Sequence, residues 1–112
     1  MAISHTINQG VIIVTLSRRL DTAGAEEFST YCTGLPAGQV ILDFSGLPYI
    51  SSTGLRAVLQ FGRERRQQGA DVVLAGSTGF VLSVLKMSGF DQIFLMYPST
   101  ADALAAMGKT AN

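Results

Sequence analysis

The feature that most constrains the fold is a short apolar run, residues 40–42, that leads directly into turn-forming and hydroxyl-bearing residues. The run reads Val-Ile-Leu without polar alternation, which is typical of a strand buried on both faces in a parallel sheet covered by helices. Residues 45–54 contain glycine, proline and three consecutive hydroxyl residues, and they predict a loop that ends at a helix start. An amphipathic helical pattern begins at Leu55. The stretch therefore predicts a buried strand, a loop and a helix in succession.

Strands and helices alternate along the rest of the chain. Residues 3–7 and 11–16 predict two strands joined by a hairpin turn, and further short strands are expected at residues 72–75 and 93–96. Helical patterns begin near residues 22, 52, 79 and 99. We therefore expect an α/β fold, in which a mixed, mainly parallel β-sheet with an N-terminal hairpin is covered by about four helices. Residues 1–108 should form a single domain, followed by a frayed tail at residues 109–112.

The composition argues against several classes of protein. Eight basic and eight acidic residues give a formal net charge of zero, whereas nucleic-acid-binding domains usually carry a basic excess. The single cysteine, Cys32, cannot form an internal disulfide, which fits a reducing compartment. We find neither a signal-peptide pattern at the start nor an apolar run long enough to cross a membrane. These observations predict a cytoplasmic domain with no direct membrane insertion and no nucleic-acid partner.

The chain lacks the residues that most catalytic centres need. His5 is the only histidine and lies on a predicted edge strand, so no base is evident for a serine nucleophile, and metal ligands are too few. Asp21, Asp43 and Asp91 are isolated carboxylates, which are more typical of helix caps and turns. We therefore predict a binding module with no enzymatic activity, no metal site and no cofactor.

Three segments could meet at one edge of the sheet, because two follow the carboxyl ends of strands and the segment at residues 18–22 does so if its strand runs the same way. They are residues 18–22, 45–54 and 76–79. The last of these lacks the lysine and the length of a nucleotide-binding loop, so we expect a tight turn there. Arg56 should project near the hydroxyl cluster, whereas the charge run at residues 63–66 is predicted to be a solvated helix end.

The central stretch resembles the signature of STAS domains, the fold of bacterial anti-sigma factor antagonists. The residues that carry this resemblance are Asp43-Phe44-Ser45-Gly46, followed after a short spacer by the segment 51–55, which reads Ser-Ser-Thr-Gly-Leu. Residues 19–21, Arg-Leu-Asp, are similar to the turn that precedes the first helix in that family. The order of strands and helices also matches, so the resemblance covers nearly the whole chain.

The resemblance implies a regulator that works by partner switching. In that scheme the unphosphorylated protein binds an anti-sigma factor that is also a serine kinase of the histidine-kinase-like ATPase fold. Phosphorylation blocks this binding, and a PPM-type serine phosphatase reverses the modification. Carried over by position, the phosphoacceptor is Ser52. The neighbouring contact residues would be Leu20, Asp21, Ser51, Thr53, Gly54 and Arg56.

One residue departs from the family pattern. Ser51 stands where an acidic residue often precedes the phosphoacceptor, so either Ser51 or Ser52 could be modified, and we favour Ser52. Two other functions share the same resemblance. The chain could be the STAS subunit of a lipid-transport ABC complex. It could also be a constitutive scaffold in a stress-signalling assembly, with the hydroxyl cluster acting only as a helix cap.

Overall fold

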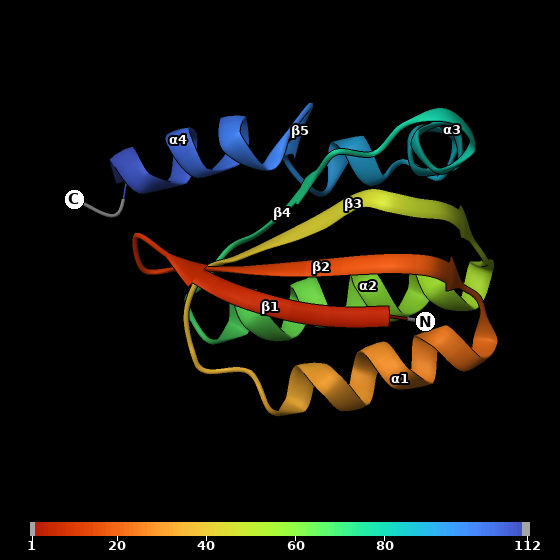
Figure 1. The fold of residues 1–112 in the computed structure, drawn as a ribbon, viewed down its shortest axis with the longest axis horizontal. Coiled ribbons are helices and arrows are strands. Elements are labelled where there is room, and N and C mark those ends of the chain that lie inside the picture. Colours follow the sequence, from red (N-terminus) through yellow and green to blue (C-terminus); the bar gives the residue numbers. More distant parts are fainter. Residues whose placement is uncertain (1, 111–112) are drawn as a thin grey trace.

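The computed structural model describes residues 2–110, which form a mixed β-sheet covered by helices (Figure 1). The five strands of the described chain are β1 (Ala2–Asn8), β2 (Val11–Leu20), β3 (Val40–Ile50), β4 (Val72–Ala75) and β5 (Met96–Tyr97). They lie in the sheet in the order of the sequence. β1 is antiparallel to β2, and all other neighbours are parallel. The predicted mixed, mainly parallel sheet with an N-terminal hairpin is confirmed.

Within residues 2–110, four α-helices cover this sheet on both sides. They are α1 (Thr22–Thr33), α2 (Ser52–Gln67), α3 (Gly79–Met87) and α4 (Thr100–Thr110), with a 3-10 turn at Phe90–Gln92. α1 and α2 lie below the sheet in Figure 1, and α3 and α4 lie above it. The tail expected at residues 109–112 begins within α4, and its last two residues lie outside the described part of the chain.

The apolar run at the start of β3 is buried on both faces, as its sequence predicts. Val40 and Leu42 pack into the cluster that contains Phe28 of α1, whereas Ile41 packs into a second cluster with Met107 of α4. Successive side chains of a strand point to opposite faces of a sheet. A strand with a helix on each face therefore needs apolar residues at consecutive positions, and this strand has them.

The prediction of a loop at residues 45–54 is wrong for residues 45–50, because β3 continues to Ile50. Its extension pairs with the end of β2, from Ser17 opposite Gly46 to Leu20 opposite Ile50, with register irregularities between. Gly46 permits close strand contact, since a Cβ there would lie 3.3 Å from the Ser17 Cβ. Pro48 is tolerated because the pairing of β3 with β4 ends before this point, so the missing amide breaks no ladder on that side.

The last strand is also displaced from its expected position. β5 comprises Met96–Tyr97, whereas we predicted residues 93–96. The apolar residues before it lie in or next to a compact turn, in which Phe94 donates its backbone N–H to the Phe90 carbonyl at 2.8 Å. The Phe94 ring packs against the bare backbone of Gly62, where a Cβ would overlap it. Phe94 is buried in this turn, whereas its apolar neighbours Ile93 and Leu95 are exposed, so the apolar pattern that we read as a strand does not mark a buried one.

The charge run on α2 is solvated except for Arg65, which corrects our prediction for that residue. Arg65 is only 6% exposed, whereas its neighbours Arg63, Glu64 and Arg66 are exposed. It follows Phe61 by one helical turn and so lies on the buried face of α2. Residue type alone predicted exposure, but helical position decided the outcome.

Candidate functional site

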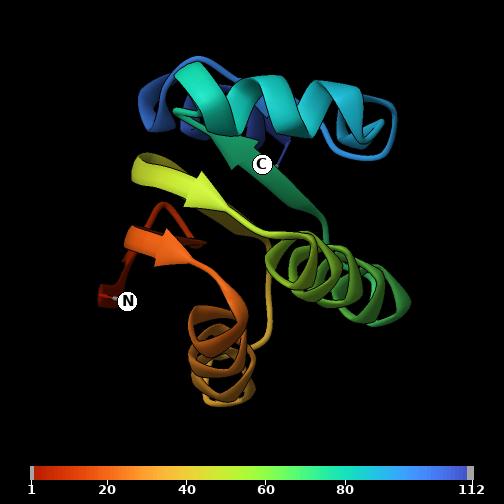
Figure 2. The same cartoon turned by 90° about the vertical axis from the view of Figure 1, so that its right-hand side faces the viewer.

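The three segments expected at one edge of the sheet do come together there. The Ser51 N–H donates to the Leu20 carbonyl at 2.9 Å, which ties the start of α2 to the end of β2. A Cβ on Gly76 would lie 2.9 Å from the Ser45 Cβ, so the segment after β4 touches β3. Figure 2 faces this edge and shows the starts of α1 and α2 side by side. The edge is therefore one continuous surface.

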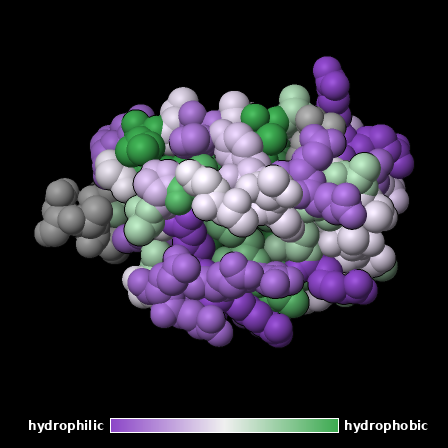
Figure 3. Space-filling model, turned by 90° about the horizontal axis from the view of Figure 1, so that it is seen from below, coloured by the Kyte–Doolittle hydropathy of each residue, from purple (hydrophilic) through white to green (hydrophobic). Residues whose placement is uncertain are grey.

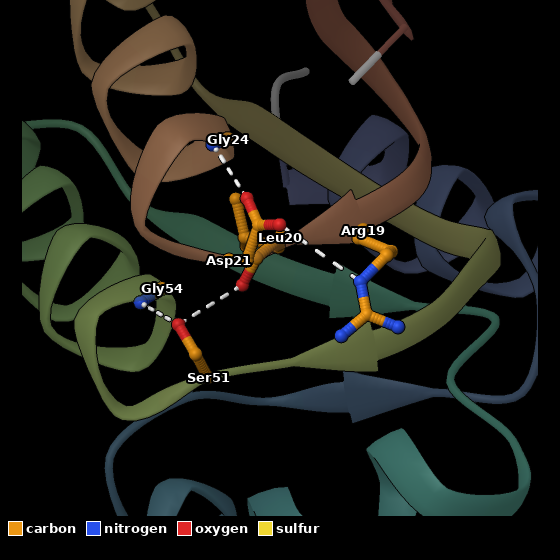
Figure 4. Close-up of polar contacts among 6 residues, drawn as sticks. All are labelled: Arg19, Leu20, Asp21, Gly24, Ser51 and Gly54. Carbon is orange, nitrogen blue, oxygen red and sulfur yellow. Dashed lines mark hydrogen bonds and ion pairs between the residues drawn. The ribbon is translucent and has the colours of Figure 1, made fainter.

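Ser51 is the N-cap of α2, and its hydroxyl is used by the fold (Figure 4). Its Oγ accepts a hydrogen bond from the Gly54 N–H at 3.1 Å and donates one to the Leu20 carbonyl at 3.3 Å. The first amides of a helix lack carbonyl partners within the helix, and a serine at this position supplies one. Ser51 thus fastens the first turn of α2 to β2.

Ser52 differs from both of its hydroxyl neighbours. It is the first residue of α2 and is exposed, and its side chain has no hydrogen-bond partner within residues 2–110. Thr53 is half-buried, and its Oγ1 lies 3.5 Å from the Thr22 Oγ1 of α1. Of the three consecutive hydroxyls, the structure leaves the one at Ser52 free and open to solvent.

Asp21 is the N-cap of α1, in keeping with our expectation that the isolated carboxylates serve caps and turns. Its Oδ1 accepts from the Gly24 N–H at 2.9 Å, and its Oδ2 lies 3.8 Å from the Arg19 Nε (Figure 4). The ion pair is long and largely exposed, so it contributes little stability. The main structural effect of Asp21 is to start α1 beside the start of α2.

Gly54 and Arg56 complete the predicted set on α2. A Cβ on Gly54 would lie 2.5 Å from the Leu20 carbonyl oxygen and 3.1 Å from the Ile50 Cγ1, so only glycine allows this close packing. Arg56 is exposed and follows Ser52 by four residues, which places the two side chains on the same helix face. Within the described residues, Arg56 makes no hydrogen bond or ion pair with the hydroxyl cluster.

A stack of three side chains beside this cluster was not predicted from the sequence. The Arg19 guanidinium lies 4.1 Å from the centre of the Tyr49 ring, and the Tyr49 and Phe80 rings are nearly parallel with centres 5.8 Å apart. Phe80, at the start of α3, is 55% exposed. Arg19 and Tyr49 are opposite each other in the sheet register, a signal we missed because we ended both strands too early.

The described residues offer little for metal or thiol chemistry. Among them, no group of three or more His, Cys, Asp or Glu side chains is arranged to hold a metal ion. Burial raises the pKa of the Cys32 thiol to about 12, although the charge of Arg65 opposes this shift. The thiol stays protonated near neutral pH, and Cys32 behaves as a small buried hydrophobe. No helix in the described part of the chain has both the length and the apolar character needed to cross a bilayer.

Solved structures share this fold at low sequence identity. A Thermotoga maritima protein that carries the provisional name of anti-sigma factor antagonist superposes with a TM-score of 0.84 at 19% identity, covering 93% of this chain and 92% of that one. SpoIIAA, an anti-sigma factor antagonist in its unphosphorylated form, gives 0.78 at 19% identity, covering 95% and 96%. The STAS domain of a SulP transporter from Vibrio cholerae gives 0.72 at 21% identity, covering 90% and 81%. These likenesses establish the fold.

Sequence comparison establishes the family. BtrV of Bordetella bronchiseptica, which carries the provisional name of anti-sigma factor antagonist, is 35% identical over 105 residues, covering 91% of this chain and 90% of BtrV. Residues 2–103 match the STAS domain family. The matched residues include the sheet, the hydroxyl cluster and most of the helices described above. The chain therefore belongs to the STAS domain family.

Proposed function

We propose that this protein is an anti-sigma factor antagonist that works by partner switching at the edge formed by Leu20, Ser51 and Ser52. Its unphosphorylated form binds an anti-sigma factor that is a serine kinase of the histidine-kinase-like ATPase fold, and this binding releases the kinase's other target. Phosphorylation of Ser52 blocks the interaction, and a PPM-type phosphatase restores it. The names of BtrV and SpoIIAA support the class of function.

The observation that carries the proposal is the unequal use of the hydroxyls. Ser51 caps α2 and binds the Leu20 carbonyl, so a phosphate on it would remove a cap. Ser52 is exposed and has no partner in the described chain, so a kinase can reach it without breaking any contact of the fold. This difference favours Ser52 as the acceptor.

The fold can accommodate a phosphate at Ser52. A helix N-terminus carries about half a positive charge and unpaired amides, both of which favour an anion. The Ser51 Oγ takes the Gly54 amide, while the amides of Ser52 and Thr53 have no acceptor within residues 2–110. Arg56 lies one turn further on the same face and adds a positive charge. Modification should therefore leave the domain folded.

The same phosphate would oppose partner binding. It adds about −1.5 to −2 charges at neutral pH. A partner surface that fits a neutral serine would have to accept this charge, with the desolvation and repulsion that follow. The adjacent stack of Arg19, Tyr49 and Phe80 provides aromatic and arginine side chains, which often dominate interface energies. Partner and phosphate would thus compete for one edge of the sheet.

The modification is tested directly by mass spectrometry. The protein is purified from its own cells under several growth and stress conditions, and its intact mass is measured, followed by fragmentation across residues 43–63. We expect the mass of one phosphate on Ser52. Failure to find phosphate on Ser51, Ser52 or Thr53 under any condition would contradict the switch and would favour a constitutive partner, such as a transport subunit or scaffold.

The binding step is tested with two matched aspartates. Each histidine-kinase-like ATPase protein of the source organism is titrated with the wild-type chain, Ser52→Asp and Ser51→Asp by calorimetry. Ser51→Asp adds the same charge one residue earlier and retains a good capping residue. We expect Ser52→Asp to lose binding with an unchanged circular dichroism spectrum, while Ser51→Asp still binds. Equal binding by all three chains would exclude Ser52 as the switch.

A further inference from the structure

A groove on the opposite side of the molecule from α3 and α4 has no role in the proposed switch. It lies between α1 and α2 and has a volume of about 660 Å³, within the range of small-molecule sites. Its lining includes Phe28, Cys32, Leu35, Ala57, Phe61 and Arg65. Figure 3 views this side and shows pale green, apolar surface in the hollow, bordered by a band of purple, hydrophilic residues.

Arg65 gives this apolar groove a buried positive charge. Among the described residues, its Nη1 donates to the carbonyls of Pro36 at 2.8 Å and Gly38 at 2.9 Å. Its guanidinium also lies 5.3 Å from the centre of the Phe61 ring. Its Nε and Nη2 have no acceptor within residues 2–110, and no carboxylate in that part of the chain forms an ion pair with it. Neither nitrogen is fully buried, so water can reach both, and an anionic head group in the groove would take the place of that water.

The other groups of the groove permit such an anion. Cys32 stays protonated because burial raises the pKa of its thiol, so the floor carries no negative charge at that point. Glu64 also lines the groove and its negative charge helps to raise the pKa of Cys32, but its side chain is exposed, so water weakens its effect on an anion in the groove. The remaining floor is aromatic and aliphatic, which suits a hydrocarbon tail rather than a polar ligand.

We infer that the groove between α1 and α2 binds a small amphiphilic anion, a medium-chain carboxylate whose tail lies on Phe28 and Phe61 and whose head accepts from the free donors of Arg65. The carboxylate would receive charge-assisted hydrogen bonds, which are stronger than neutral ones. The tail would remove apolar floor from water. This site is separate from the Ser52 edge, so the inference does not depend on the proposed function.

Three ligands with the same eight-carbon tail test the chemistry. The full chain, labelled with ¹⁵N, is titrated with octanoate, 1-octanol and octylammonium, and amide shifts are followed by NMR. We expect octanoate to shift amides of residues 28–35 and 57–65 and to bind about tenfold more tightly than octanol, as a charged hydrogen bond should allow. Octylammonium should bind least. Equal affinity for octanoate and octanol, shifts elsewhere, or no octanoate binding would each overturn the inference.

Two matched tryptophan variants test the location without disturbing Arg65. Ser29 is exposed and lines the groove, while the adjacent Thr30 is exposed and does not line it. We expect Ser29→Trp to lose measurable octanoate binding and Thr30→Trp to keep the wild-type affinity, with both amide spectra showing a folded chain. Wild-type affinity in both variants would place octanoate elsewhere and contradict the inference.

Discussion

The tripeptide Ser-Thr-Gly lies at the start of two consecutive helices of this protein, yet its role differs between them. At residues 52–54 it lies within the first turn of α2, behind the capping residue Ser51. At residues 77–79 it is shifted by two positions, so that Thr78 occupies the cap of α3 and forms no side-chain cap hydrogen bond. The preceding residue explains the shift, because Ser51 can cap a helix with its side chain and Gly76 cannot. Local sequence identity does not fix position in the helix.

The two glycines of this repeated tripeptide are needed for different reasons. Gly54 has no room for a side chain, because a Cβ would lie 2.5 Å from the Leu20 carbonyl oxygen. Gly79 has open space around it but a φ of 55°, a left-handed conformation that favours glycine. One glycine allows close packing and the other allows a turn.

The two serines differ in access. Ser52 is exposed at the helix start, whereas the Ser77 Oγ is buried and has no hydrogen-bond partner among the described residues. A kinase could reach Ser52 but not the Ser77 hydroxyl without opening the fold. The comparison shows why the sequence motif needs its structural context before a modification site can be proposed.

The largest effect is expected from Gly54→Ala. The added Cβ would clash with backbone, which cannot move as a flexible side chain can, so the end of β2 or the start of α2 must shift. We expect the free energy of unfolding to fall by roughly 3 kcal/mol in urea titrations followed by circular dichroism.

Gly79→Ala is the matched control for this crowding. Its Cβ meets open space and only the left-handed backbone conformation is disfavoured, which costs about 1 kcal/mol. If Gly79→Ala lowered the free energy of unfolding as much as Gly54→Ala, backbone conformation rather than packing would explain why both helix starts need glycine.

The second prediction concerns the residue that follows each of the two glycines. Leu55 packs against the core, whereas Phe80 is exposed and stacks on Tyr49. We expect Phe80→Ala to weaken binding of the proposed kinase partner about tenfold, as loss of an aromatic interface anchor would. Calorimetry with the partner that discriminates Ser52→Asp from wild type provides the measurement.

Met87 supplies the control for Phe80 on the same helix. It is 86% exposed but does not belong to the Arg19–Tyr49–Phe80 stack. We expect Met87→Ala to bind like wild type and both variants to keep their melting temperatures. If Met87→Ala weakened binding as much as Phe80→Ala, the partner would contact the whole outer face of α3 rather than the stack.

Much of the fold followed from residue patterns because burial and periodicity are local signals. The continuous apolar run at residues 40–42 correctly predicted a strand covered on both faces, and residues 72–75 were placed as a strand with the observed bounds. The convergence of three segments at one edge also followed, since parallel strands end on the same side of a sheet.

What the sequence did not show depends on contacts between distant segments. Gly46 and Pro48 are typical of a loop, and only the partner strand β2 makes them part of a sheet. Arg65 is charged like its neighbours, and only the Pro36 and Gly38 carbonyls explain its burial. Tyr49 stacks on a residue that is 31 positions away in the sequence, which no local pattern can indicate.

The smallest expected effect is the difference in stability loss between alanine variants of the two helix caps, Ser51 and Thr78. Ser51→Ala removes the acceptor of the Gly54 amide, so we expect the free energy of unfolding to fall by about 1 kcal/mol, the usual cost of losing a cap. Thr78→Ala removes no side-chain cap bond and should change stability by less than about 0.5 kcal/mol. Thermal and urea unfolding of both variants measure the difference. Equal losses would mean that the Thr78 hydroxyl caps α3 in solution, so that the two helix starts would not differ in side-chain capping.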